Sequence, residues 1–215
     1  MNKLDGITLN IELTLISIIQ GVTLYFLIDS SRTILLEREY FFWPYVATGL
    51  VVICLFWSRA IIHTLTIIRW PMDFGHTFLY IITAFIQAIA FTQASKPAHW
   101  FALFGILAIF IWGLFFWDLK IIERTMPRLR SVATLALFEE AKLSQRRNIR
   151  WILPFSFGFN VMASFAVLRW PEIFMMRHWH LAFIAFQFTA ATIYLLEGIH
   201  FFKRTLNHYQ DANDE

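Results

Sequence analysis

Six apolar stretches constrain what this chain can fold into, because each is long enough to cross a lipid bilayer as a single helix. A spanning helix needs about 20 residues, with about 17 as the lower limit. The stretches lie near residues 9–29, 43–68, 75–94, 99–122, 151–168 and 180–202. The fifth is the shortest and contains Pro154 and Gly158, so we expect a kink there.

The composition also indicates a membrane protein. Hydrophobic residues make up 58% of the 215 positions and charged residues 15%, whereas a soluble domain carries about 25% charged residues. So few polar residues cannot cover the surface of a soluble particle. The sequence therefore predicts an all-α, polytopic membrane protein with six transmembrane helices, in which residues 1–215 form one integral membrane domain in contact with the lipid bilayer.

The distribution of Lys and Arg predicts the orientation. Six spans place both ends of the chain on one side, and basic residues are concentrated in the loop after the fourth span and behind the sixth span. The positive-inside rule then predicts cytoplasmic N- and C-termini, in what we expect to be a bacterial inner membrane. The net charge of +3 is expected to face lipid head groups, so no nucleic-acid partner is predicted.

The segment 123–150 is predicted to be a cytoplasmic helical linker between the fourth and fifth spans. We expect a break at Pro127 and an amphipathic helix from about Ser131, a plausible N-cap, to Asn148. Its apolar residues recur at roughly helical spacing, at Val132, Leu135, Phe138 and Leu143. Two interpretations stay open: the helix lies on the inner leaflet, or residues 120–150 dock a cytoplasmic protein partner or a neighbouring subunit.

Polar residues inside the first two spans predict a pore or a polar cavity. One narrow stripe follows the first helix at Asn10, Thr14, Ser17 and Gly21, with Gln20 beside it. In the second span, Arg59 and His63 lie one turn apart, and ionisable groups at that depth usually face protein or water. The alternative is that Arg59 extends its charge to the membrane surface and that the stripe only joins helices.

Two carboxylate-x-x-His motifs raise the question of a metal site. Asp73 and His76 lie at the start of the third span, and Glu197 and His200 lie at the end of the sixth. This spacing places both side chains of a motif on one helix face, as in the di-metal centres of helical bundles. Charged residues and histidines are also common at helix ends near a membrane surface, so the alternative is that these four side chains are interfacial and bind no metal.

Three functions are compatible with these features. The first is an oligomeric ion channel, pore or transporter, and we expect a homo-oligomer because so small a chain rarely encloses a wide polar path alone. The second is a non-catalytic membrane subunit or sensor that docks a cytoplasmic partner. The third and least favoured is a membrane-embedded metalloenzyme, since no signature of a soluble enzyme appears and the sequence identifies no cofactor.

The orientation is tested by cysteine labelling. In a Cys54→Ser background, we expect Lys96→Cys to react with a membrane-impermeant maleimide added outside intact cells, because residue 96 falls in a predicted outer loop. Lys142→Cys should react only after the membrane is opened, because residue 142 falls in the predicted cytoplasmic linker. The reverse labelling pattern would overturn the predicted orientation.

Overall fold

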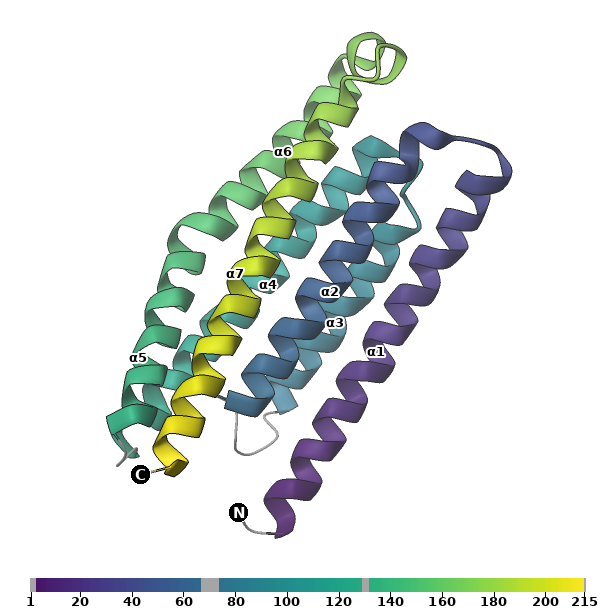
Figure 1. The fold of residues 1–215 in the computed structure, drawn as a ribbon. Coiled ribbons are helices and arrows are strands. Elements are labelled where there is room, and N and C mark those ends of the chain that lie inside the picture. The colour runs from purple at the N-terminus through teal and green to yellow at the C-terminus, as the bar shows by residue number, and fades with distance from the viewer. Residues whose placement is uncertain (1–2, 67–73, 129–131, 215) are drawn as a thin grey trace.

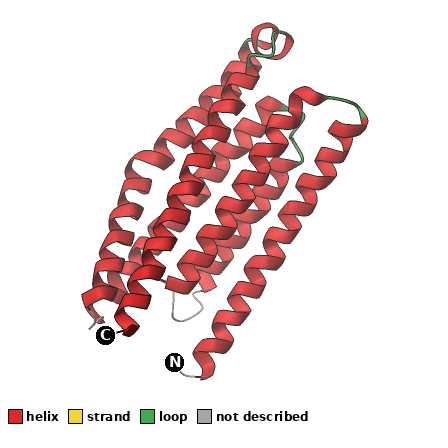
Figure 2. Ribbon diagram, viewed as in Figure 1, coloured by secondary structure: helices red, strands yellow, loops and turns green. Residues whose placement is uncertain are grey.

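The structure is a bundle of long helices joined by short loops. This computed structural model describes residues 3–66, 74–128 and 132–214, and these residues contain no strand (Figure 2). The long helices are α1 (Lys3–Leu36), α2 (Trp43–Thr66), α3 (Phe74–Phe91), α4 (Pro97–Thr125), α5 (Val132–Arg147), α6 (Leu153–Arg169) and α7 (His180–Asp214). Short 3-10 segments cover Tyr40–Phe42 and Met126–Arg128, and π-helical segments cover Asn148–Ile152 and Glu172–Met176.

Both ends of the chain lie at the same end of the bundle (Figure 1), which we call the termini end; the opposite end is the loop end. Five helices are long and apolar enough to cross a membrane: Asn10–Leu36, Tyr40–Ile62, Pro97–Thr125, Phe138–Arg169 and His180–Lys203. The apolar part of α3, Gly75–Phe91, is shorter. The all-helical architecture is thus confirmed, with five candidate membrane-spanning helices, and a sixth crossing by α3 stays a prediction.

The helices form a ring, in which each packs against the next in the order α1, α2, α7, α6, α4, α3 and back to α1. Glycine allows close approach where α2 packs on α1, because a Cβ at Gly49 would lie only 2.7 Å from Leu27 Cδ1. Where α4 packs on α6, a Cβ at Gly105 would meet Val161 Cγ2 at an ordinary contact distance of 3.4 Å. The least extensive contact in the ring is between α6 and α7.

The surface of the bundle is apolar and its interior contains many polar side chains. Ile18, Phe85, Phe165 and Leu168 are each more than half exposed, as expected for side chains that contact lipid. Buried amides and hydroxyls instead pair across helices inside the ring. An example is the hydrogen bond of 2.9 Å that Gln20 Nε2 of α1 donates to the Tyr80 hydroxyl of α3. In a bilayer such groups have no water to bind, so they turn inward.

The structure does not confirm a separate amphipathic helix between the fourth and fifth spans. The helix α4 does end before Pro127, but α5 continues through the π-helical segment Asn148–Ile152 into α6. Its apolar residues Phe138 and Ala141 pack on Ile122 of α4. The predicted N-cap, Ser131, lies outside the described residues.

The π-helical segment keeps one face of this long helix buried. Buried residues recur every three or four positions along α5, at Phe138, Ala141, Gln145 and Asn148, and then resume at Leu153. Pro154 follows directly and has no N–H to donate to the carbonyl of Arg150, so a regular α-helix cannot continue here. A π-helix uses i→i+5 hydrogen bonds, and the extra residue keeps the buried faces of α5 and α6 in line.

The Gly49 contact generates a stability prediction. Gly49→Val should lower the free energy of unfolding by about 1–3 kcal/mol, because the new side chain would overlap with Leu27 and Phe91 in a packed interface. Thermal unfolding in mild detergent measures the change. The matched control is Gly158→Val, where a Cβ meets no atom within 4 Å and where valine is the better helix former. Equal melting temperatures for the two variants would contradict the packing that we describe.

Candidate functional site

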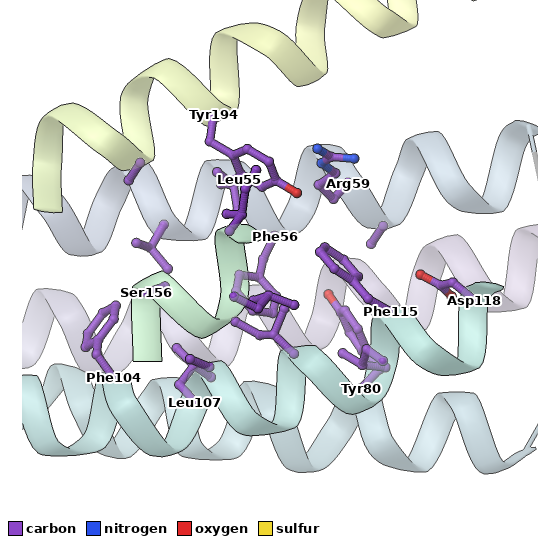
Figure 3. Close-up of a pocket in the computed structure, with 18 of the residues that line it drawn as sticks. Leu55, Phe56, Arg59, Tyr80, Phe104, Leu107, Phe115, Asp118, Ser156 and Tyr194 are labelled. Carbon is purple, nitrogen blue, oxygen red and sulfur yellow. The ribbon is translucent and has the colours of Figure 1, made fainter. Parts of the chain in front are cut away.

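A cavity of about 270 Å³ lies inside the ring and is lined by residues from all six of its helices (Figure 3). Its walls are mainly aliphatic and aromatic, and they include Leu55, Phe56, Phe104, Leu107 and Phe115. Small-molecule sites are usually built in this way, with an apolar wall and a few polar groups that fix the orientation of the ligand.

Ionisable residues line the cavity at the termini end. Each comes from a different helix, near the point where that helix reaches this end: Glu12 of α1, Arg59 of α2, His76 of α3 and Asp118 of α4. Charged groups inside apolar spans are costly, and they usually mark a site where a ligand or an ion is handled. This end of the cavity is therefore the candidate functional site.

Arg59 is the cation of the site. Its guanidinium carbon lies 4.5 Å from the centroid of the Tyr194 ring of α7 (Figure 3), which is a cation–π contact. Gly198, one turn further along α7, lies beside the same side chain, and a Cβ there would meet Arg59 Nε at an ordinary contact distance of 3.8 Å. The Nε atom is buried and has no hydrogen-bond partner in the described part of the chain, and none of the described carboxylates forms an ion pair with Arg59.

His76 and Asp118 form the second element of the site. His76 Nε2 lies 3.0 Å from Asp118 Oδ1, and the Asp118 side chain is only 4% exposed. From α5, Gln145 Nε2 donates a long hydrogen bond of 3.4 Å to Asp118 Oδ2. From α1, Glu12 interacts electrostatically with His76. The imidazole thus pairs with Asp118, and the Glu12 carboxyl lines the same end of the cavity.

Neutral hydrogen bonds and aromatic rings close the loop end of the cavity. Trp100 Nε1 of α4 donates to Gln187 Oε1 of α7 at 2.9 Å, and Gln187 Nε2 donates to Asn160 Oδ1 of α6 at 3.1 Å. Beyond them the Trp100 ring stacks on Phe104 and meets the Tyr45 ring edge-on, with centroid distances of 4.5 and 5.4 Å. Sequence reasoning missed this network, although amides inside apolar helices are a signal that could have indicated it.

The cavity adjoins the surface of the bundle between α6 and α7. Phe155, Phe186 and Ala190 line the cavity and are also exposed. The rings of Phe155 and Phe186 lie 6.1 Å apart, from centroid to centroid. The contact between these two helices at this depth is therefore made partly by large, movable side chains.

A second, larger hollow lies behind Arg59. This crevice of about 560 Å³ is formed by α5 and α7, with polar lining from Glu140, Ser144, Arg147 and Glu197, and Arg59 belongs to its lining too. Arg147 Nη2 and Glu197 Oε2 form an exposed ion pair of 2.8 Å in its wall. Arg59 thus stands between a polar crevice and an apolar cavity.

Of the residues predicted to line a pore or cavity, Arg59 lines the observed cavity. Gln20 is buried and reaches the cavity through Tyr80, whereas Asn10, Thr14, Ser17 and Gly21 are exposed on α1 and are not part of its lining. The hydroxyls of Thr14 and Ser17 donate to the backbone carbonyls of Asn10 and Leu13.

The side chain of His63, which was also predicted to line the cavity, lies outside the described part. Glu12, which sequence reasoning missed, lines the cavity instead, and an isolated carboxylate in the first apolar run is a signal that could have indicated it.

The four residues of the predicted metal site are not brought together where they are described. His76 pairs with Asp118, Glu197 pairs with Arg147, and His200 Nδ1 lies 3.2 Å from the Leu196 carbonyl of its own helix. No group of three or more His, Cys, Asp or Glu with metal-binding geometry occurs among the described residues. Asp73 lies outside them, so a site that includes it stays a prediction.

Comparisons with known proteins give no relative. No protein-family model matches the chain, and no curated protein and no solved structure is significantly similar to it. The candidate site therefore has to be interpreted from its own chemistry.

The network at the loop end generates a stability prediction. Gln187→Leu should lower the free energy of unfolding by about 1–3 kcal/mol, because Trp100 Nε1 and Asn160 Oδ1 lose their partner in a buried place. Thermal unfolding in detergent measures this. Gln93→Leu is the control, because Gln93 lies in a loop and its side chain donates a hydrogen bond to the neighbouring Thr92 and not to another helix. A loss no larger than that of the control would show that Gln187 does not hold the loop end together.

Proposed function

We propose that the protein is a membrane transporter that binds a small amphipathic anion inside its helix bundle. The observation that carries this proposal is Arg59, a cation without an ion-pair partner among the described residues, at the end of an apolar cavity. The anionic group of the solute would take the free donors of the guanidinium, and its apolar part would lie along Leu55, Phe56 and Leu107.

An anion fits this site better than a cation does. Asp118 already lies beside His76, so the cation of the site with unused hydrogen-bonding capacity is Arg59. A guanidinium has five N–H donors in a planar fork that matches carboxylate, sulfonate and phosphate groups. Arg59 Nε has no hydrogen-bond partner among the described residues, and none of the described carboxylates pairs with the guanidinium, so this group has donors to offer an anion.

The shape of the cavity favours a transporter over a channel. A channel needs a continuous path, whereas the Trp100–Gln187–Asn160 network and the aromatic rings beyond it close the loop end. At the termini end, Arg59 lines both the cavity and the polar crevice. A transporter that works by alternating access has two conformations, and in each of them the binding cavity is closed toward one side of the membrane.

The topology that accompanies this proposal is six spans with both termini in the cytoplasm of a bacterium. Arg59 and the crevice would then face the cytoplasm, and the Trp100 network would face the outside. A homo-oligomer and a cytoplasmic partner for residues 120–150 also remain predictions. A protein that binds the solute without moving it would act as a sensor, and the experiment below separates the two functions.

The test uses two probes with the same hexyl tail and permanent, opposite charges: hexanesulfonate and hexyltrimethylammonium. We expect proteoliposomes loaded with unlabelled hexanesulfonate to accumulate the labelled compound by counterflow, and the cationic probe not to be taken up. Arg59→Ala should abolish uptake and Arg59→Lys should restore it only in part, because lysine keeps the charge but loses the planar fork.

The matched control separates filling of the cavity from a general disturbance of α7. Ala190→Trp places a large ring in the cavity and should block uptake, whereas Ala185→Trp lies on the same helix outside the cavity lining and should not. Binding in nanodiscs without counterflow would favour the sensor. Uptake that is unchanged in Arg59→Ala, or equal for the two probes, would overturn the proposal.

A further inference from the structure

Three ionisable side chains from three helices form one electrostatic cluster in the cavity wall. His76 Nε2 of α3 lies 3.0 Å from Asp118 Oδ1 of α4, and Glu12 of α1 interacts electrostatically with the same imidazole. All three line the cavity in which Arg59 lies. Carboxyl and imidazole groups that lie this close together titrate as a coupled unit, so a proton bound there belongs to the group of side chains and not to one of them.

The other groups around this cluster are few. Among the described residues that line the cavity, the remaining titratable or charged ones are Arg59 of α2, Tyr80 of α3 and Tyr194 of α7. The helix α6 contributes only the neutral Ser156 and Asn160, and α5 contributes the neutral Gln145. Arg59 is therefore the one permanent cation among the described residues that line the cavity, and Arg147 of α5 lines the adjoining crevice.

Asn148, at the start of the π-helical segment, supplies a second observation. It is 0% exposed, and neither polar atom of its side-chain amide has a hydrogen-bond partner among the described residues. It follows Gln145 by one helical turn on the same buried face, and Gln145 bonds to Asp118. A buried amide with two unused atoms is a place where an ordered water is expected. Water there would continue the polar route from Asp118 into the helix interface.

We propose that the Glu12–His76–Asp118 cluster binds one proton together with the anion, so that the protein carries both in the same direction. This inference rests on the proposed function and adds the coupling ion. One proton leaves bulk water at the termini end through the crevice beside Arg59 and binds to a carboxylate oxygen or an imidazole nitrogen of the cluster. The same proton is released when the cavity opens at the other end, and no covalent bond of the solute changes.

The coupling follows from charge. An anion that neutralises Arg59 removes the positive potential that disfavours a proton on the cluster and adds a negative charge near it. Proton binding and anion binding therefore strengthen each other, and the effect is reciprocal. If one proton is bound for each anion, the affinity for the anion rises roughly tenfold for each unit by which the pH falls, over the range in which the empty cluster is deprotonated.

The experiment counts protons directly. Hexanesulfonate is titrated into the protein in nanodiscs by calorimetry at one pH, in two buffers with different enthalpies of ionisation. The difference between the two heats gives the number of protons taken up with each bound anion. We expect a value near one for the wild type and near zero for Asp118→Asn, and Glu12→Gln should also lower it.

Glu123→Gln is the matched control, because Glu123 is an acidic residue of α4 that lies outside the cavity and pairs with Arg146. It should keep the value near one. If Asp118→Asn does not fold, the numbers of protons taken up by the wild type and by Glu12→Gln still test the inference. Binding of hexanesulfonate by the wild type with no proton uptake overturns this inference and leaves the proposed function in place, whereas no binding of hexanesulfonate overturns the proposed function itself.

A transport measurement gives an independent readout. In liposomes filled with a pH-sensitive dye, an inward gradient of hexanesulfonate should acidify the interior when the protein is present. The acidification should be lost in Asp118→Asn and kept in Glu123→Gln. Uptake of the labelled anion by the wild type without a change of internal pH would contradict the coupling.

Discussion

In a lipid bilayer a polar side chain finds a hydrogen-bond partner only within the protein, and the arrangement of this bundle depends on that constraint. Gln20 of α1 bonds to Tyr80 of α3, and Tyr45 of α2 lies 3.0 Å from His180 of α7. Because hydrogen bonds are directional, each of these pairs fixes the height of one helix against another. Apolar packing alone would allow the helices to slide, since lipid tails are as apolar as the side chains that face them.

The two ends of the cavity satisfy this constraint to different degrees. At the loop end, Trp100 and Gln187 are neutral and bonded to each other. At the termini end, Arg59 has an aromatic ring beside it but no described carboxylate within ion-pair distance. Hydrogen bonds between the helices hold the loop end together. A charge without a counter-ion in an apolar environment is stabilised when a solute of opposite charge binds beside it. This difference is the basis of the proposed function.

The apolar runs predicted where the long helices lie, because the length and hydropathy of a span depend on the chain alone. They did not predict which face of α1 turns inward. Thr14 and Ser17 form a regular stripe, but each hydroxyl bonds to the backbone of its own helix and so needs no partner from another helix. The union of α5 with α6 was missed for a similar reason. The polar run that ends at Asn148 is typical of the end of a surface helix, and only the packing on α4 shows that the helix continues.

Because of the π-helical segment Asn148–Ile152, the alignment of α5 with α6 depends more on the number of residues in this part of the chain than on which residues they are. Successive residues of an α-helix are rotated by about 100° about its axis. Loss of one residue from this segment would therefore turn Phe138 and Gln145 away from α4 while Asn160 stayed in place. Substitutions at positions such as Ile149 and Trp151 would have little effect on how the buried faces of α5 and α6 align. A deletion of one residue would misalign them. In related sequences, conserved spacing between Gln145 and Asn160 would thus be a better sign of the same architecture than conserved identity.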